Sequence, residues 1–211
     1  MNELYKKIQL TRRDIGNLLF HFSRRTDSLG AYDILKKIIS QRTLIGGIGL
    51  VKGKHECISF TEAPISEVVS YFNTTKILTG PHYLRYEPFG IAFSKKYLFK
   101  KGARPVIYQP EQDYSILPQE LRYRHVTFDL DRDIDFTWER EWRLKTDELH
   151  LEPEHCFIIV PKQVYLDDLY SEFLHWEPDY VSNGEDYDIM GSSPQRIWKI
   201  VTLEMFGFEE L

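Results

Sequence analysis

The chain has few of the features that stabilise secreted or membrane-anchored proteins. Its 211 residues include only two cysteines, Cys57 and Cys156. It has no apolar run long enough to cross a bilayer, and its start does not show the pattern of a signal peptide. These absences favour a cytoplasmic protein with reduced thiols and without a membrane partner, although one disulfide is arithmetically possible.

Strong charge of one sign and the common catalytic motifs are also missing. The 32 acidic residues outnumber the 27 basic ones, which gives a formal net charge of −5. This balance argues against a protein devoted to nucleic acid. The sequence contains no Walker loop, no dinucleotide-binding glycine fingerprint, no Gly-x-Ser-x-Gly elbow and no nuclease-type metal cluster.

The apolar content is sufficient for one packed domain. Hydrophobic residues make up 42% of the chain and aromatic residues 14%. No repeat, low-complexity stretch or linker divides it, so residues 1–211 are interpreted as a single domain. Alternating and helical apolar patterns predict strands at 18–23, 56–60, 89–94, 104–109, 138–145, 155–160 and 197–205, and helices at 28–41, 64–72, 118–125 and 163–174. Residues 176–195 are expected to be an irregular loop.

These elements do not alternate regularly between strand and helix. The pattern therefore predicts an α+β fold with a mixed, mostly antiparallel and possibly split sheet flanked by helices.

The segment 138–145, Trp-Glu-Arg-Glu-Trp-Arg-Leu-Lys, is the most informative part of the sequence. On a strand, side chains alternate between two faces. One face would carry the apolar Trp138 and Trp142 with one arginine, and the other would carry Glu139, Glu141 and Arg143. The charged face is either an exposed edge, which discourages aggregation, or the floor of a polar cleft.

Two other segments carry candidate binding residues. His21 and Ser23 lie in and at the end of the first predicted strand, and Arg24 and Arg25 follow them as possible phosphate ligands. In the second strand, Ser59 could line a pocket, and Phe60 could stack on a planar ring. The alternative for each segment is a half-buried or core strand with no ligand.

Two further possibilities have weaker support. His55, Cys57, His155 and Cys156 could supply four zinc ligands if their segments met, but no zinc-type spacing is present, so no metal is expected. The basic stretch 95–104, with interleaved aromatic residues, could contact RNA or DNA, although such stretches are more often solvated helix faces.

Several segments in order resemble the AbiGi-type abortive-infection proteins of bacteria and related phage proteins. They are Leu-Phe-His-Phe-Ser, Cys-Ile-Ser-Phe-Thr-Glu-Ala-Pro, Tyr-Glu-Pro-Phe-Gly-Ile-Ala-Phe-Ser-Lys, Gly-Ala-Arg-Pro-Val-Ile-Tyr and Trp-Glu-Arg-Glu-Trp-Arg-Leu, between residues 18 and 160. The resemblance implies a role in phage defence or in a toxin–antitoxin pair, with a partner protein encoded nearby.

The same order also resembles a remote ADP-ribosyltransferase layout. Such enzymes place His or Arg on an early strand, an aromatic or Ser/Thr element on a middle strand, and Glu on a late strand. His21 matches the first position, Ser59 or Phe60 the second, and Glu141 with Glu139 the late Glu-x-Glu element. The middle element departs from the expected Tyr or Ser-Thr-Ser.

This second resemblance implies an NAD cofactor and a protein or nucleic-acid target of modification. Release of nicotinamide from NAD passes through an oxocarbenium-like transition state, which a carboxylate stabilises. The alternative function is a non-catalytic, antitoxin-like or regulatory protein-binding module. Catalysis requires His21, Ser59 or Phe60, and Glu141 to converge on one cleft.

Overall fold

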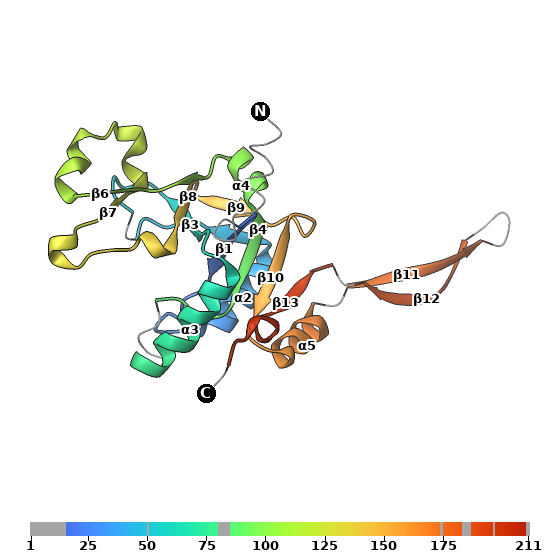
Figure 1. Ribbon diagram of the computed structural model, residues 1–211. Coiled ribbons are helices and arrows are strands. Elements are labelled where there is room, and N and C mark those ends of the chain that lie inside the picture. Colours follow the sequence, from blue (N-terminus) through green and yellow to red (C-terminus); the bar gives the residue numbers. More distant parts are fainter. Residues whose placement is uncertain are drawn as a thin grey trace, which may run out of the picture.

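Seven strands form the central sheet of the computed structural model, which describes residues 16–49, 51–79, 85–173, 175–182, 187–195 and 197–209. The strand order is β13-β10-β4-β1-β3-β8-β5 (Figure 1). Their bounds are Ile200–Thr202, Cys156–Val160, Gly90–Ser94, Leu18–Phe22, Cys57–Thr61, Glu141–Lys145 and Arg104–Pro105. Among the neighbouring strands of this sheet, only β10 and β13 pair in parallel, so the predicted α+β class with a mixed, mostly antiparallel sheet is confirmed.

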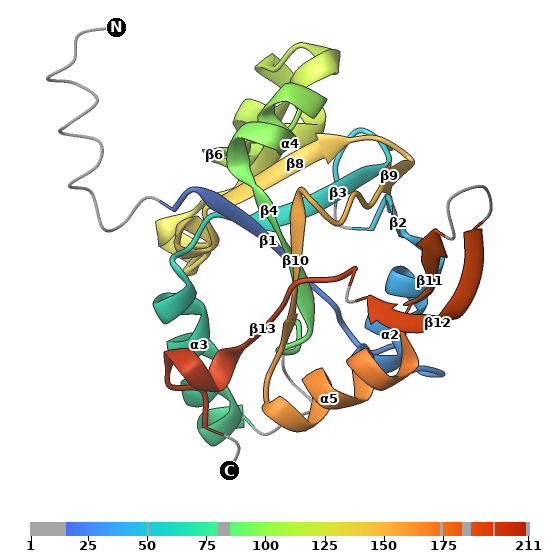
Figure 2. The ribbon, with the colours of Figure 1, turned by 90° about the vertical axis from the view of Figure 1, so that its right-hand side faces the viewer.

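Helices cover both faces of this sheet (Figure 2). On one face, Leu35 of α2 (Ala31–Gln41), Leu98 of α4 (Lys95–Lys101) and Leu169 of α5 (Gln163–Glu172) join the larger core cluster. On the other face, Phe72 of α3 (Ile65–Thr79) and Leu203 of the 3₁₀ helix η6 (Leu203–Phe206) join a second cluster. The strand alternation explains this arrangement, because Leu19 enters the first cluster and Phe20 the second.

Close packing of β1 and β4 depends on a residue without a side chain. Gly90 pairs with Phe22 in register. A Cβ atom at Gly90 would overlap the carbonyl oxygen of His21 and lie 3.1 Å from the Cα of Phe22. The glycine therefore sets the distance between the two central strands at the end where the candidate residues lie.

Further segments extend from the sheet. The strands β6 (Ile107–Gln109) and β7 (His125–Thr127) pair in parallel, and β2 (Thr43–Ile45) pairs with β9 (Glu148–His150). We call the segment 104–140 the β6–β7 lobe. Its 3₁₀ helices are η2 (Glu111–Ile116), η3 (Gln119–Arg124), η4 (Leu130–Arg132) and η5 (Thr137–Glu139). In Figure 1 the lobe and the hairpin of β11 (His175–Ser182) and β12 (Tyr187–Gln195) extend from opposite sides of the sheet.

Several predicted elements differ from the structure. The expected loop at 176–195 is wrong where the structure describes it, because β11 and β12 form an antiparallel hairpin. The single strand expected at 104–109 is two short strands in different sheets. Helix α2 begins after Gly30, not near Ser28, and the last strand ends at Thr202, where η6 follows. The predicted end of the 163–174 helix, Leu174, lies outside the described residues.

The informative segment 138–145 is not one strand. Arg140 adopts a left-handed backbone conformation with φ of 45°, and this separates the 3₁₀ turn η5 from strand β8. Trp142 still packs against the larger core, but Trp138 is 43% exposed and stacks on Tyr71. The prediction that Trp138 and Trp142 share a core-facing strand surface is therefore wrong for Trp138.

Candidate active site

The candidate site begins where β1 and β3 diverge. The register between these strands contains one pair, Phe20 with Thr61. Beyond it, Nδ1 of His21 lies 2.9 Å from the carbonyl oxygen of Ser59 and donates to it. Burial lowers the pKa of His21, which favours the neutral ring with its proton on Nδ1. A neutral ring of this tautomer presents Nε2 as a hydrogen-bond acceptor.

Glu141 begins β8 and is held by two neighbours on the same sheet face. The hydroxyl of Ser59 donates to its Oε1 at 2.7 Å. Nε of Arg143 donates to Oε1 at 2.7 Å, and Nη2 donates to Oε2 at 3.1 Å. Because these donors leave acceptor capacity on Oε2, the carboxylate can still accept a bond from one ligand hydroxyl.

Arg143 fixes the carboxylate to the β6–β7 lobe. Its side chain is 6% exposed, and Nη1 donates to the carbonyl oxygens of Tyr123 at 2.6 Å and His125 at 3.4 Å. The hydroxyl of Tyr108 accepts from the backbone N–H of Glu141 at 3.0 Å. The orientation of Glu141 therefore depends on the position of the lobe as well as on the sheet.

Glu139 reaches the same region from η5, although it is not on the strand. The residue is 7% exposed, and Nη1 of Arg85 lies 2.9 Å from its Oε1. This contact is an ion pair without hydrogen-bond geometry, so among the described residues the oxygen has no hydrogen-bond partner. Burial raises the pKa of Glu139 to about 7, the charge of Glu141 adds to this effect, and Arg85 and Arg143 oppose it.

One cleft of about 260 Å³ gathers these groups. Five of the residues predicted from the sequence line it with polar side chains; they are His21, Arg24, Ser59, Glu139 and Glu141. Arg143 also lines it, but its guanidinium is already bound by Glu141 and two carbonyls. Arg24 is exposed and has no hydrogen-bond or ion-pair partner among the described residues, so its guanidinium is available to an anion.

Two other predicted ligand-binding residues do not line the cleft, and a third lines it with a buried ring. Ser23 is buried and does not line the cleft, and Arg25 forms a two-point ion pair with Glu87 at 2.7 and 2.8 Å. Phe60 borders the cleft, but it is 2% exposed and its ring packs in the larger core against Phe93. In this position the ring offers little surface for stacking on a ligand.

The structure adds three residues to the site that the sequence patterns did not indicate. Arg85 and Tyr86 line the cleft from the segment before β4, and Tyr108 contacts the backbone of Glu141 from β6. Burial raises the pKa of Tyr108 to about 12. Arg85 and Tyr86 precede a strand and belong to no helical or alternating pattern, so only their tertiary position shows their role.

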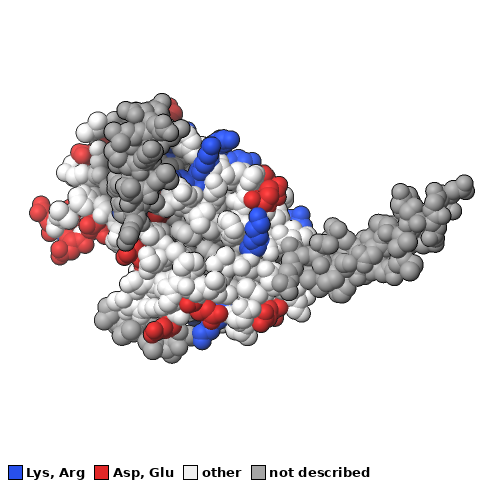
Figure 3. Space-filling model, turned by 45° about the vertical axis from the view of Figure 1, so that its right-hand side comes forward, with Lys and Arg blue, Asp and Glu red and all other residues white. Residues whose placement is uncertain are grey.

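The basic stretch 95–104 is largely engaged within the protein. Lys95 donates to Glu62 at 2.6 Å, and Lys101 lies 3.5 Å from Glu152. Arg104 donates to two carbonyl oxygens and lies over the ring of Phe99. On the face drawn in Figure 3, outside its grey atoms, basic and acidic side chains both occur and no broad surface of one sign is visible.

The zinc possibility fails on the sheet order. Cys57 is on β3 and Cys156 on β10, and the strands β1 and β4 lie between them. Three strand spacings alone separate the two residues by at least roughly 14 Å, whereas sulfurs that share a zinc ion lie about 4 Å apart. Both cysteines are free and buried.

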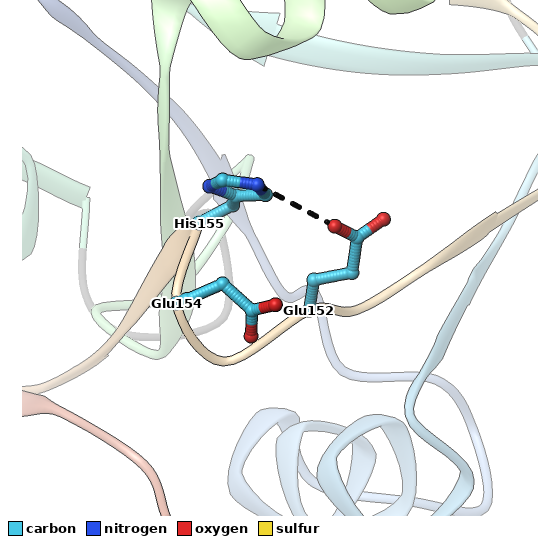
Figure 4. A group of neighbouring side chains, drawn as sticks. All are labelled: Glu152, Glu154 and His155. Carbon is cyan, nitrogen blue, oxygen red and sulfur yellow. Dashed lines mark ion pairs between the residues drawn. The ribbon is translucent and has the colours of Figure 1, made fainter.

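Another group of possible metal ligands lies on the surface, at Glu152, Glu154 and His155 (Figure 4). Their ligand atoms lie within 4.8 Å of one another. Glu152 already accepts from the hydroxyl of Tyr97 at 3.0 Å and pairs with Lys101 and His155 at 3.5 Å. These contacts account for the positions of Glu152 and His155, and we assign no ion to the group.

The fold and the cleft together define the protein as an α+β domain with a carboxylate-lined site at the divergence of two central strands. Comparison of the chain with protein-family models, curated proteins and solved structures found no match. In the part of the chain that the structure describes, no helix has both the length and the apolar character needed to cross a membrane.

Proposed function

We propose that the protein is an NAD-consuming enzyme of the ADP-ribosyltransferase type. The observation that carries the proposal is the convergence of His21, Ser59 and Glu141 on one cleft from three adjacent strands. This is the arrangement that catalysis would require. The resemblance to ADP-ribosyltransferases in the order of these residue types adds support.

The geometry suits cleavage of the bond between nicotinamide and ribose. As this bond breaks, positive charge develops on the ribose, and a fixed carboxylate stabilises that charge. Glu141 is fixed by Ser59 and Arg143 and retains acceptor capacity for a ribose hydroxyl. The Nε2 acceptor of His21 would hold a second ribose hydroxyl, and Arg24 would meet a phosphate of the pyrophosphate.

Glu139 would be the group of the cleft that exchanges a proton when the ligand and the attacking nucleophile bind. A group that exchanges protons acts best when its pKa is near the working pH, and burial raises the pKa of Glu139 to about 7. The nucleophile would be water in a glycohydrolase, or a group of a protein or nucleic acid in a transferase.

The first test is NAD binding followed by release of nicotinamide. Calorimetric titration of the full chain with NAD should give saturable binding, and chromatography should detect free nicotinamide. The Glu141→Gln variant should release nicotinamide at least about 100-fold more slowly, as expected for loss of charge stabilisation in the transition state. Glu148→Gln, an exposed glutamate on β9, is the matched control and should behave as wild type.

The proposed biological role is a toxin-like function in phage defence, and it rests on the resemblance to abortive-infection proteins. Induced expression in bacterial cells should arrest growth and lower cellular NAD or label a macromolecule with ADP-ribose. The Glu141→Gln variant should be tolerated at equal protein level. Equal toxicity of both forms would contradict a role through this site.

One observation favours the second candidate, a non-catalytic antitoxin-like or regulatory module. Both carboxylate oxygens of Glu141 are engaged by Arg143, which is how a purely structural ion pair also looks. If the protein is such a module, calorimetric titration with NAD would show no saturable binding that depends on Glu141. Co-purification of a partner encoded nearby, unaffected by Glu141→Gln, would support the binding module.

A further inference from the structure

Glu139 is a buried carboxylate with an oxygen that accepts no hydrogen bond from the described residues. Its side chain is 9% exposed, and Oε1 has no hydrogen-bond partner among the described residues. Arg85 supplies the nearest positive charge, at 2.9 Å, without the geometry of a hydrogen bond. A buried carboxylate usually accepts two or more hydrogen bonds, so this one depends on its single ion pair to remain charged.

Arg85 is not confined in the same way. Its side chain is 37% exposed, and its guanidinium lies over the ring of Phe136, 4.7 Å from the centroid. It lines the cleft together with Arg24. A guanidinium binds phosphate more tightly with two parallel hydrogen bonds than it binds a carboxylate with poor geometry. An anion in the cleft can therefore compete with Glu139 for Arg85.

Three charged groups act on Glu139, and their balance decides its protonation. Arg85 and Arg143 favour the charged form, and Glu141 disfavours it. Arg143 is already bound by Glu141 on both oxygens, so it has little freedom to compensate for another charge. Two tyrosines among the described residues also face Glu139, Tyr86 and Tyr108; burial raises the pKa of both, and their neutral phenols supply no positive charge.

We propose that Arg85 exchanges Glu139 for the phosphate of a bound dinucleotide, and that Glu139 then takes up one proton from solvent. The inference rests on the proposed function and deepens it, because it assigns Arg85 as a ligand-binding residue. No covalent bond changes. The phosphate replaces the carboxylate beside Arg85, the proton comes from the buffer, and the neutral acid becomes a hydrogen-bond donor inside the cleft.

Proton uptake on binding is the quantity that tests this exchange. The full-length protein is titrated with NAD at pH 8 in several buffers of different ionisation enthalpy. The slope of the observed enthalpy against the buffer enthalpy gives the number of protons taken up. A group whose pKa is about 7 is about nine-tenths ionised at pH 8, so the wild type should take up a measurable fraction of a proton per NAD, with an upper limit of about 0.9.

Two variants connect the uptake to these residues. The Glu139→Gln variant cannot bind the proton, so its uptake should fall to zero at saturating NAD. The Arg85→Gln variant lacks the counter-ion from the start, so Glu139 should already be largely protonated, and both the uptake and the affinity should fall. The matched control is Arg132→Gln, which removes an exposed arginine of η4 that does not line the cleft. Its uptake should equal that of the wild type.

The outcomes separate this inference from the proposed function. Saturable binding of NAD without proton uptake, or with equal uptake in Glu139→Gln, overturns the exchange and leaves the proposed function standing. Unchanged uptake and affinity in Arg85→Gln overturn the assignment of Arg85. Absence of any NAD binding to the wild type overturns both.

Discussion

Replacement of Arg143 by leucine tests whether the Glu141–Arg143 pair is a buried interaction. The two side chains are 6% and 11% exposed, so solvent screens their charges little. The substitution leaves the Glu141 carboxylate without its two-point partner and the carbonyl oxygens of Tyr123 and His125 without this donor. Removal of one partner from a buried pair costs about 3–5 kcal/mol.

A loss of this size is a large share of the stability of a typical domain, which is about 5–15 kcal/mol. For a chain of this length each kcal/mol lowers the melting temperature by about 2–4 °C. The expected fall for Arg143→Leu is therefore roughly 6–20 °C. Urea denaturation followed by circular dichroism measures the free energy of unfolding, and a thermal scan measures the melting temperature.

The double variant Arg143→Leu with Glu141→Leu gives the sharper result. Most of the cost in Arg143→Leu comes from the carboxylate that stays buried without a partner, so removal of that carboxylate should restore stability. The double variant should therefore be more stable than Arg143→Leu alone. If Arg143→Leu costs less than about 1 kcal/mol, or if the second substitution destabilises further, the pair behaves as a solvent-screened surface interaction and the reasoning is refuted.

Three other predictions concern Glu139, Ser59 and Gly90. Because burial raises the pKa of Glu139 from its ordinary value of 4.5 to about 7, its contribution to stability is fully present below pH 4.5 and is lost as the pH rises through 7. The wild type should lose roughly 3 kcal/mol relative to Glu139→Gln across this range, measured by urea denaturation at several pH values, and parallel curves would contradict the shift. The Ser59→Ala variant should lose about 1.5–3 kcal/mol in the same assay, because the Glu141 carboxylate loses a donor; no change would mean that water replaces the hydroxyl. The free energy of unfolding of the Gly90→Ala variant should fall by about 1–3 kcal/mol, because the added Cβ overlaps β1. An added Cβ at Gly47 meets no atom within 4 Å, so Gly47→Ala should lower the free energy of unfolding far less.

The sequence alone was sufficient for the class of the fold. Alternating apolar residues predicted β1, β3, β4 and β10 within one or two residues, because each of these strands is buried on at least one face. The helical stripe of Ala31, Leu35 and Ile39 likewise predicted α2. Local patterns were weaker where the strand is short: β2, β7 and β9 have three residues each, too few to show a period.

The hairpin of β11 and β12 was predicted wrongly, as a loop, for a different reason. Its sequence is rich in Gly, Asp, Ser and Pro, which is typical of loops, and this composition concealed the alternation. The dipeptide Asn183-Gly184 is a frequent hairpin signal and was the available indication.

Residue types and their order determine which side chains are candidates: the sequence pattern indicates His21, Ser59, Glu139 and Glu141, and all four line one cleft. Tertiary structure decided what each of them can do. Glu139 reaches the cleft from a 3₁₀ turn and not from a strand, and Arg85 reaches it from a segment without a recognisable pattern. Periodicity reports which face of its own element a residue occupies, whereas burial, charge balance and pKa depend on neighbours that are distant in sequence, and only the folded chain brings those neighbours together.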